Sequence, residues 1–151
     1  MQTVGLTALV EKLKLKNLTP DVDMSNIAIT TPNINRPALQ LAGYFDHFAS
    51  DRVQIIGYVE YTYLKHLTAE QRVPIYEKFL SSEIPCVIFS SRTEPDDEFL
   101  RLAIKYNKPL LASEQETSPF MAECIRALST MLAPCISIHG VLVDVYGEGV
   151  L

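Results

Sequence analysis

The sequence contains few cysteines, little positive charge and no long hydrophobic run, and each shortage excludes a class of protein. Lysine and arginine number 13 against 18 aspartates and glutamates, so the net charge is −5. That balance supplies no positive field for a phosphate backbone, so we expect no nucleic acid partner. No apolar run approaches the roughly 18 residues that span a bilayer, and the start Met1-Gln-Thr-Val lacks the features of a signal peptide. We therefore expect a cytoplasmic protein that binds no membrane.

The three cysteines, Cys86, Cys124 and Cys135, form no CxxC pair and are odd in number. Cys86 lies in an apolar run of strand length, and Cys124 lies at an apolar position of a helical pattern. These features predict buried free thiols rather than a disulfide or a metal site. His47 and His66 have no partner at ligand spacing, which also argues against a metal site.

The remaining composition is that of one globular domain, since 48% of the 151 residues are apolar. Helical spacing predicts a helix over residues 3–15 with Thr3 as its N-cap, and Pro37 opens a short helix that ends at Gly43. Thr68 and Gln71 form a predicted capping box at the start of a helix, and Pro74 is expected either to kink that helix or to restart it.

Two further helices are predicted in the second half of the chain. The stretch 95–98 places a proline and acidic residues in a first turn, where the helix dipole favours acids. Ser118-Pro119 is the expected cap of the other helix. Their predicted buried faces are Phe99, Leu102, Ala103 and Tyr106 for the first, and Met121, Cys124, Ile125, Leu128 and Leu132 for the second.

Short apolar runs at 27–29, 53–56, 84–89 and 109–112 are predicted strands, and most alternate with the helices. This order, with continuous rather than alternating apolar strands, predicts an α/β fold with a mostly parallel sheet covered by helices on both faces.

The last residues break this rhythm. Ala133-Pro134 ends the final helix, and 135–146 is rich in strand formers with no helix following. We therefore expect one α/β domain at 1–132 and, at 133–151, the start of a second domain that is truncated.

Three segments resemble the HPr kinase/phosphorylase family, in order along the chain. Asn35-Arg-Pro-Ala-Leu-Gln-Leu-Ala-Gly-Tyr-Phe45 is similar to its SRPGLxLxGYF signature, although Ala38 replaces a glycine. Ser50-Asp-Arg-Val-Gln-Ile-Ile-Gly57 is similar to its xERIQLxG segment. Residues 137–151, from Ser-Ile-His-Gly to Val-Leu, resemble the family's lead-in to a glycine-rich GxSGxGKS loop.

The resemblance implies a bifunctional serine protein kinase of carbon catabolite repression. Such an enzyme uses ATP and Mg²⁺ to phosphorylate a serine of HPr, the phosphocarrier of the sugar phosphotransferase system. It reverses the reaction by phosphorolysis with inorganic phosphate. The resemblance also implies a homohexamer and an N-terminal domain similar in fold to that of Mur ligases. This 151-residue piece is expected to bind no cofactor and to be inactive alone, because the phosphate-binding loop lies beyond it.

One residue matches a family active-site position. His139 corresponds to a histidine that faces the phosphates, a role that a group titrating near neutral pH suits; the alternative is a partly buried, hydrogen-bonded histidine at a strand break. Arg36 and Arg52 could bind a phosphate or carboxylate, but we favour pairing with nearby acids such as Asp46 and Asp51.

Two other readings stay open from the sequence. A non-enzymatic regulatory or assembly module could bind a small anionic ligand, although no glycine-rich cradle or basic cluster marks such a site. The second alternative is a flavodoxin-like electron carrier, although nothing in the sequence specifies a flavin site.

Gly147-Glu-Gly149 has no following GK[ST], so within this chain it is predicted to be a turn. The acids at 94–98 are interpreted as a helix start rather than as catalytic carboxylates.

Overall fold

A computed structural model describes residues 2–134, and its central feature is a five-stranded sheet in the order β2-β7-β6-β5-β4. Strands β4 (Ile34–Asn35), β5 (Val53–Ile56), β6 (Val87–Phe89) and β7 (Leu110–Ala112) run parallel, and β2 (Lys16–Asn17) joins the β7 edge antiparallel. A separate two-stranded sheet pairs β1 (Val4–Gly5) with β3 (Ala28–Ile29). The predicted α/β class with a mostly parallel sheet is confirmed.

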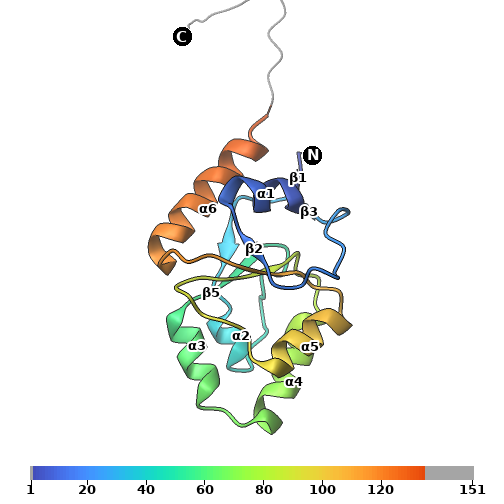
Figure 1. Ribbon diagram of the computed structural model, residues 1–151, viewed down its shortest axis with the longest axis vertical. Coiled ribbons are helices and arrows are strands. Elements are labelled where there is room, and N and C mark those ends of the chain that lie inside the picture. Colours follow the sequence, from blue (N-terminus) through green and yellow to red (C-terminus); the bar gives the residue numbers. More distant parts are fainter. Residues whose placement is uncertain (1, 135–151) are drawn as a thin grey trace, which may run out of the picture.

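Helices cover both faces of this sheet, as predicted (Figure 1). Helices α1 (Leu6–Leu13) and α6 (Thr117–Leu132) pack on one face, where they meet Ile55, Ile88 and Leu111. The other face carries α2 (Ala38–Leu41), α3 (Tyr58–Lys65), α4 (Ala69–Leu80) and α5 (Asp97–Lys105). Because successive side chains of a strand point to opposite faces, neighbouring residues of one strand pack into two different hydrophobic cores.

Several local predictions are confirmed in detail. In α4 the Thr68 hydroxyl accepts from the Gln71 N–H, and the Gln71 amide oxygen accepts from the Thr68 N–H. The helix does not restart at Pro74, one of the two expected outcomes, but continues through it to Leu80 as one element. Helix α5 buries Phe99, Leu102 and Ala103, and α6 ends at Leu132, just before Ala133-Pro134.

The predicted helix starts at Thr3 and Ser118 are wrong. Val4 and Gly5 pair with β3 instead, so α1 begins at Leu6. Helix α6 begins at Thr117, whose N–H donates to the Ser91 hydroxyl of a distant loop. Ile125, predicted to be buried, is 40% exposed. Of the second-domain start predicted at 133–151, residues 135–151 lie outside the described residues, and so does Cys135.

The predicted burial of Cys86 and Cys124 as free thiols is confirmed. Both lie in the core between the sheet, α1 and α6. Burial raises the pKa of both thiols, that of Cys124 to about 12. Within residues 2–134 no helix combines the length and apolar character needed to cross a membrane.

We predict that these two thiols resist alkylation in the folded protein. At pH 8 the raised pKa and the surrounding core leave almost no accessible thiolate, and the thiolate is the reactive species. Iodoacetamide should label the Cys86 and Cys124 peptides at least about a hundredfold more slowly than in urea-unfolded protein. Peptide-resolved mass spectrometry measures both rates, and rapid native labelling of Cys124 would contradict its burial.

Candidate functional site

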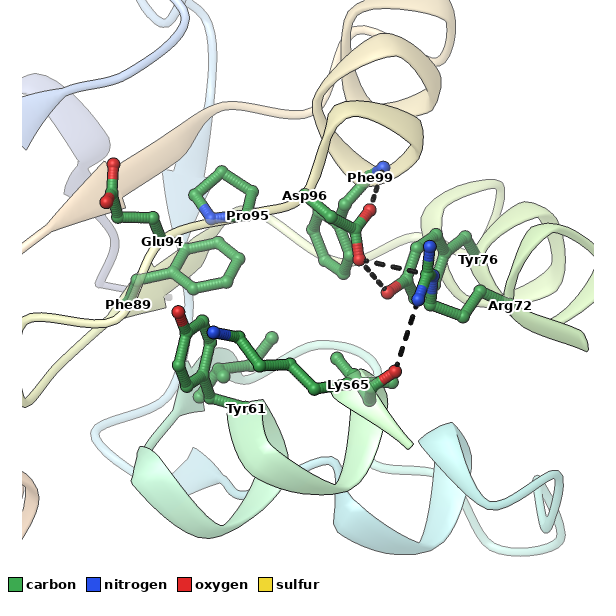
Figure 2. A pocket seen from close by; sticks show the side chains of 11 residues that line it. Tyr61, Lys65, Arg72, Tyr76, Phe89, Glu94, Pro95, Asp96 and Phe99 are labelled. Carbon is green, nitrogen blue, oxygen red and sulfur yellow. Dashed lines mark hydrogen bonds and ion pairs between the residues drawn. The ribbon is translucent and has the colours of Figure 1, made fainter. Parts of the chain in front are cut away.

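A crevice of about 230 Å³ opens at the carboxyl ends of β5 and β6. Ile56 and Phe89, the last residues of these strands, form part of its floor. Ligands of open α/β sheets bind outside the carboxyl ends of parallel strands, which makes this the first place to look for a site. Figure 2 shows the lining side chains, which come from the ends of β5 and β6, from α3 and α4, and from the segment that leads into the first turn of α5: Ile56, Tyr61, Leu64, Lys65, Arg72, Tyr76, Phe89, Glu94, Pro95, Asp96 and Phe99.

One wall of the crevice is a network centred on Asp96, the N-cap of α5. Its Oδ1 accepts from the Phe99 N–H at 2.8 Å, and its Oδ2 accepts from the Tyr76 hydroxyl at 2.5 Å (Figure 2). Burial, together with this hydrogen bond to a carboxylate, raises the pKa of Tyr76. The network therefore holds Tyr76 as a neutral donor.

Arg72 occupies the other side of that network. Its Nη2 donates to Glu98 Oε1 at 2.8 Å, its Nη1 donates to the Leu67 carbonyl at 2.8 Å, and its Nε lies 3.5 Å from Asp96 Oδ2. The hydrogen bond to Glu98 is the main reason that the pKa of Arg72 is raised. Its Nε is buried and makes no hydrogen bond among the described residues. The guanidinium is thus committed to two carboxylates of the protein itself.

At the mouth of the crevice the Lys65 ammonium lies over the Tyr61 ring, 4.4 Å from its centroid. Contact with the Tyr61 hydroxyl raises the pKa of Lys65. Glu94 lies across the crevice on the exposed rim (Figure 2). Among the residues that line the crevice, Lys65 and Arg72 balance Glu94 and Asp96, so the lining carries no net charge. This balance gives no support to a small anionic ligand at this crevice.

The arrangement favours structure over acid–base chemistry. Asp96 caps a helix, Arg72 is paired twice, and Tyr76 titrates far above neutral pH, so these three groups are poor proton shuttles near pH 7. The interpretation of residues 94–98 as a helix start is confirmed, since Asp96 is the N-cap of α5. What sequence reasoning missed is that Asp96 also joins α5 to α4 through Tyr76.

We predict that Asp96→Ala lowers the free energy of unfolding by about 2 kcal/mol, because it removes a helix cap and leaves the buried Tyr76 hydroxyl without its partner. Asp97→Ala is the matched control: Asp97 is exposed in the same turn, so its loss should cost less than about 1 kcal/mol. Urea denaturation measures the free energy of unfolding of both variants. Equal losses of stability in the two would argue against the network.

A second cluster of polar groups lies beside the same strand ends. Ser91 and Arg92, in the loop that follows β6, adopt left-handed backbone conformations with φ of 56° and 58°. The Ser91 hydroxyl lies 2.8 Å from the Thr117 hydroxyl, which in turn lies 2.8 Å from the Ser90 hydroxyl. Ser90 also donates to the Ile56 carbonyl at 3.0 Å. These contacts join the ends of β5 and β6 to the start of α6.

Arg36, the arginine of the first family-like segment, is held in an ion pair. Its Nε and Nη2 donate to the two carboxylate oxygens of Glu60 at 3.0 and 2.6 Å, and Glu60 is almost fully buried. Glu60 also accepts from the Gly57 N–H at 2.8 Å at the start of α3. The prediction that Arg36 pairs with an acid is confirmed, but the partner is Glu60 rather than Asp46 or Asp51.

Gly57 is required at this junction for space. A Cβ there would lie 2.6 Å from the Thr117 hydroxyl and 2.8 Å from Arg36 Nη2.

The interaction predicted for Arg52 is different from the one observed: its Nη1 donates to the Ile34 carbonyl at 3.4 Å. His47 and His66 are exposed. Among residues 2–134 no three His, Cys, Asp or Glu side chains are grouped to hold a metal. His139 and Gly147-Glu-Gly149 lie outside the described residues.

Residues 4–128 match the family model described as HPr serine kinase N terminus. A protein of Lachnoclostridium phytofermentans named HPr kinase/phosphorylase is 52% identical over the whole chain, which covers 49% of that relative. Proteins of the same name from Caldicellulosiruptor bescii and Streptococcus thermophilus are 46% and 40% identical over 99% of the chain, which covers 47% and 48% of them. The chain thus spans about half the length of the curated relatives it matches.

Among solved structures, the fold resembles the CBS and DRTGG domains of the regulatory region of Clostridium perfringens pyrophosphatase, determined in complex with the activator diadenosine tetraphosphate. The TM-score is 0.54 at 15% identity, and the match covers 80% of this chain and 45% of that chain. At this identity the likeness concerns the fold alone.

Proposed function

The chain belongs to the family of HPr serine kinase N-terminal domains, and from that premise we propose that it is the N-terminal half of a bifunctional HPr kinase/phosphorylase. The observation that carries the proposal is the 52% identity to a protein of that name along all 151 residues, over 49% of that protein's length. The three segments that resemble the family lie in order along the same stretch.

The whole protein then transfers the γ-phosphoryl group of ATP, with Mg²⁺, to a serine hydroxyl of HPr and releases ADP. In the reverse direction inorganic phosphate attacks the phosphoserine, and pyrophosphate and serine are the products. The chemistry of the described residues agrees with a site located elsewhere in the protein. Arg72 at the crevice wall is paired with Asp96 and Glu98 rather than free to hold a phosphate, and the charges that line the crevice cancel.

His139 is the proposed catalytic residue of this chain. It lies in the segment that resembles the lead-in to a phosphate-binding loop. An imidazole near neutral pKa can donate to a phosphate oxygen or to the incoming nucleophile.

The proposed domain division places an α/β domain at 1–132 and the start of the kinase domain at 133–151. Helix α6 ends at Leu132 and the family match ends at residue 128, which supports a boundary here. The proposal includes a cytoplasmic location, HPr as protein partner and assembly of the whole protein into a homohexamer.

The test is a phosphoryl-transfer assay with radiolabelled ATP, Mg²⁺ and HPr. A longer protein that continues through a GxSGxGKS loop should phosphorylate HPr. The 151-residue chain, shown to be folded by circular dichroism, should give no transfer above the enzyme-free background. Transfer by the 151-residue chain would contradict the proposed division, and failure of the longer protein on HPr would contradict the proposed activity.

A further inference from the structure

The chain leaves two neighbouring strands of the sheet in opposite directions. After β6 it turns toward α5 on one face, and after β7 it turns toward α6 on the other face (Figure 1). The helices that follow β4 and β5 lie on the same face as α5, so the reversal lies between β6 and β7. In open α/β sheets the preferred place for a ligand is the carboxyl end of the strands at such a reversal.

A groove of about 870 Å³ opens at this place. It is lined by the loop after β6 (residues 92–94), by the end of β7 with the residues that follow it (112–115), and by the segment from the end of α1 through β2 (12–18). Lys16 of β2 is paired with Ala112 of β7, which brings this segment to the carboxyl end of the sheet. The volume lies within the range of about 300–1,000 Å³ that small-molecule sites have.

Four cationic side chains line this groove. Lys12, Lys14 and Lys16 are exposed, whereas the leucines between them are buried, and Arg92 is exposed on the loop after β6. Within residues 2–134 none of the four forms an ion pair. Lys12 also stabilises the last turn of α1, because a cation there interacts favourably with the helix dipole. That explanation does not extend to the other three, which lie outside helices.

The acids of the groove offset these charges only in part. Glu94, Glu114 and Glu123 are among the lining residues, so four cations against three acids leave one positive charge, in a chain whose net charge is −5. Glu123 accepts a hydrogen bond from the Gln115 side chain at 2.6 Å. The local balance is opposite in sign to that of the whole chain, and it favours an anion over a cation.

The loops around the groove are braced against each other. The Ser91 N–H donates to the Gln115 carbonyl at 2.7 Å, and the Thr117 N–H donates to the Ser91 hydroxyl at 2.9 Å. Lys14, Ser91 and Arg92 adopt left-handed backbone conformations, with φ of 55°, 56° and 58°. Non-glycine residues rarely adopt this conformation, and those that do are common at ligand sites, where surrounding contacts hold them. The groove is thus preorganised, which lowers the entropic cost of binding.

The cations lie on two sides of the end of β7. Arg92 follows β6, whereas Lys14 and Lys16 lie at β2, on the other side of β7. Neighbouring strands are about 4.8 Å apart, so the two backbone segments that carry the cations are separated by about 10 Å. A ligand with anionic groups at two points matches this spacing better than a single small ion does.

We propose that this groove binds a small organic polyanion, a molecule with phosphate or carboxylate groups at two points, which bridges Arg92 on one side and Lys14 and Lys16 on the other. Guanidinium and ammonium groups bind both kinds of anion through charge-assisted hydrogen bonds. The proposal concerns binding alone, so it does not depend on the catalytic activity proposed above.

Isothermal titration calorimetry of the 151-residue chain tests the proposal with inorganic tripolyphosphate, tricarballylate and orthophosphate. Low ionic strength is used because salt screens exposed charges. At least one of the two polyanions should bind with a Kd below about 1 mM. Orthophosphate should bind at least about tenfold more weakly, because it contacts one side of the groove only. Tighter binding of tripolyphosphate identifies phosphate groups in the ligand, and tighter binding of tricarballylate identifies carboxylates.

Single substitutions locate the site. Arg92→Gln and, separately, Lys14→Gln should raise the Kd of the tighter polyanion at least about fivefold, because each removes one charge-assisted contact. Arg101→Gln is the matched control, since Arg101 is exposed on α5 outside the groove and its loss changes the net charge equally. The control should raise the Kd less than about twofold. All three variants should keep the thermal melting temperature of the unchanged chain, measured by circular dichroism.

Three results would overturn the proposal. The first is no binding of either polyanion up to about 10 mM. The second is an equal effect of Arg92→Gln and Arg101→Gln, which would indicate attraction by overall charge rather than a site. The third is binding of a polyglutamate peptide without binding of the small polyanions, which would mean that the groove takes an acidic protein segment.

Discussion

Phe99→Ala is expected to lower the free energy of unfolding by about 3–5 kcal/mol. The Phe99 side chain is fully buried where α5 meets the sheet. Its ring centroid lies 4.7 Å from that of Tyr76, 5.3 Å from that of Phe89 and 6.4 Å from that of Phe79. Removing the ring leaves a cavity whose rigid aromatic walls come from α4 and β6, so the surroundings can close it only in part.

Urea denaturation followed by circular dichroism measures this loss. Ile104→Ala, on the same helix but 47% exposed, is the control and should change stability by less than about 1 kcal/mol. A Phe99→Ala loss no greater than that of the control would mean that α5 does not pack on the sheet as described.

Arg36→Ala is expected to cost about 3 kcal/mol. Removing one partner of a buried ion pair costs about 3–5 kcal/mol, because it leaves an uncompensated buried charge. We take the low end because a third of the Arg36 side chain is exposed, whereas that of Glu60 is 3% exposed. The pair also joins the β4–α2 junction to the first turn of α3, so its loss should loosen the contact between these two segments.

Arg52→Ala provides the comparison at a neighbouring strand. Within residues 2–134 the Arg52 side chain makes a single long hydrogen bond, to the Ile34 carbonyl, and its replacement should cost less than about 1 kcal/mol. Thermal and urea unfolding of both variants distinguish the two arginines. Equal stability of Arg36→Ala and the unchanged chain would show that Glu60 does not need its partner.

Patterns that depend on neighbours in sequence could be predicted well. The capping box of α4 involves residues three apart, and the apolar strand β5 together with Gly57 follows from local composition. The parallel arrangement follows from strands and helices that alternate along the chain. These features need no knowledge of distant contacts.

Features that depend on distant partners could not be predicted. Helix α3 was missed because its aromatic-rich sequence has weak helix propensity and its N-cap is Gly57, whose N–H is satisfied by Glu60. The Glu60 three residues after Gly57 was the available signal. The start of α6 depends on Ser91, and the acid that pairs with Arg36 is 24 residues away in sequence. No local pattern contains these contacts.

The crevice shows the same division. Residues 94–98 could be identified as a helix start from their composition alone. Two further contacts form only when α4 and α5 pack together. The Tyr76 hydroxyl donates a hydrogen bond to Asp96, and Arg72 pairs with Glu98. The family-like segment 35–45 was recognisable as a pattern, but the exposure of some of its apolar side chains came from the structure.

We propose that phosphoryl transfer takes place outside the α/β domain and that His139 takes part in it. The most direct measurement compares single substitutions in the longer protein by their initial rates of HPr serine phosphorylation. Lys65→Ala and Glu94→Ala, which change the crevice rim, should keep the rate within about threefold of the unchanged protein. His139→Ala should reduce it at least about a hundredfold, the usual contribution of a general acid or base. An unchanged rate with His139→Ala, or a comparable loss with Lys65→Ala, would contradict the account.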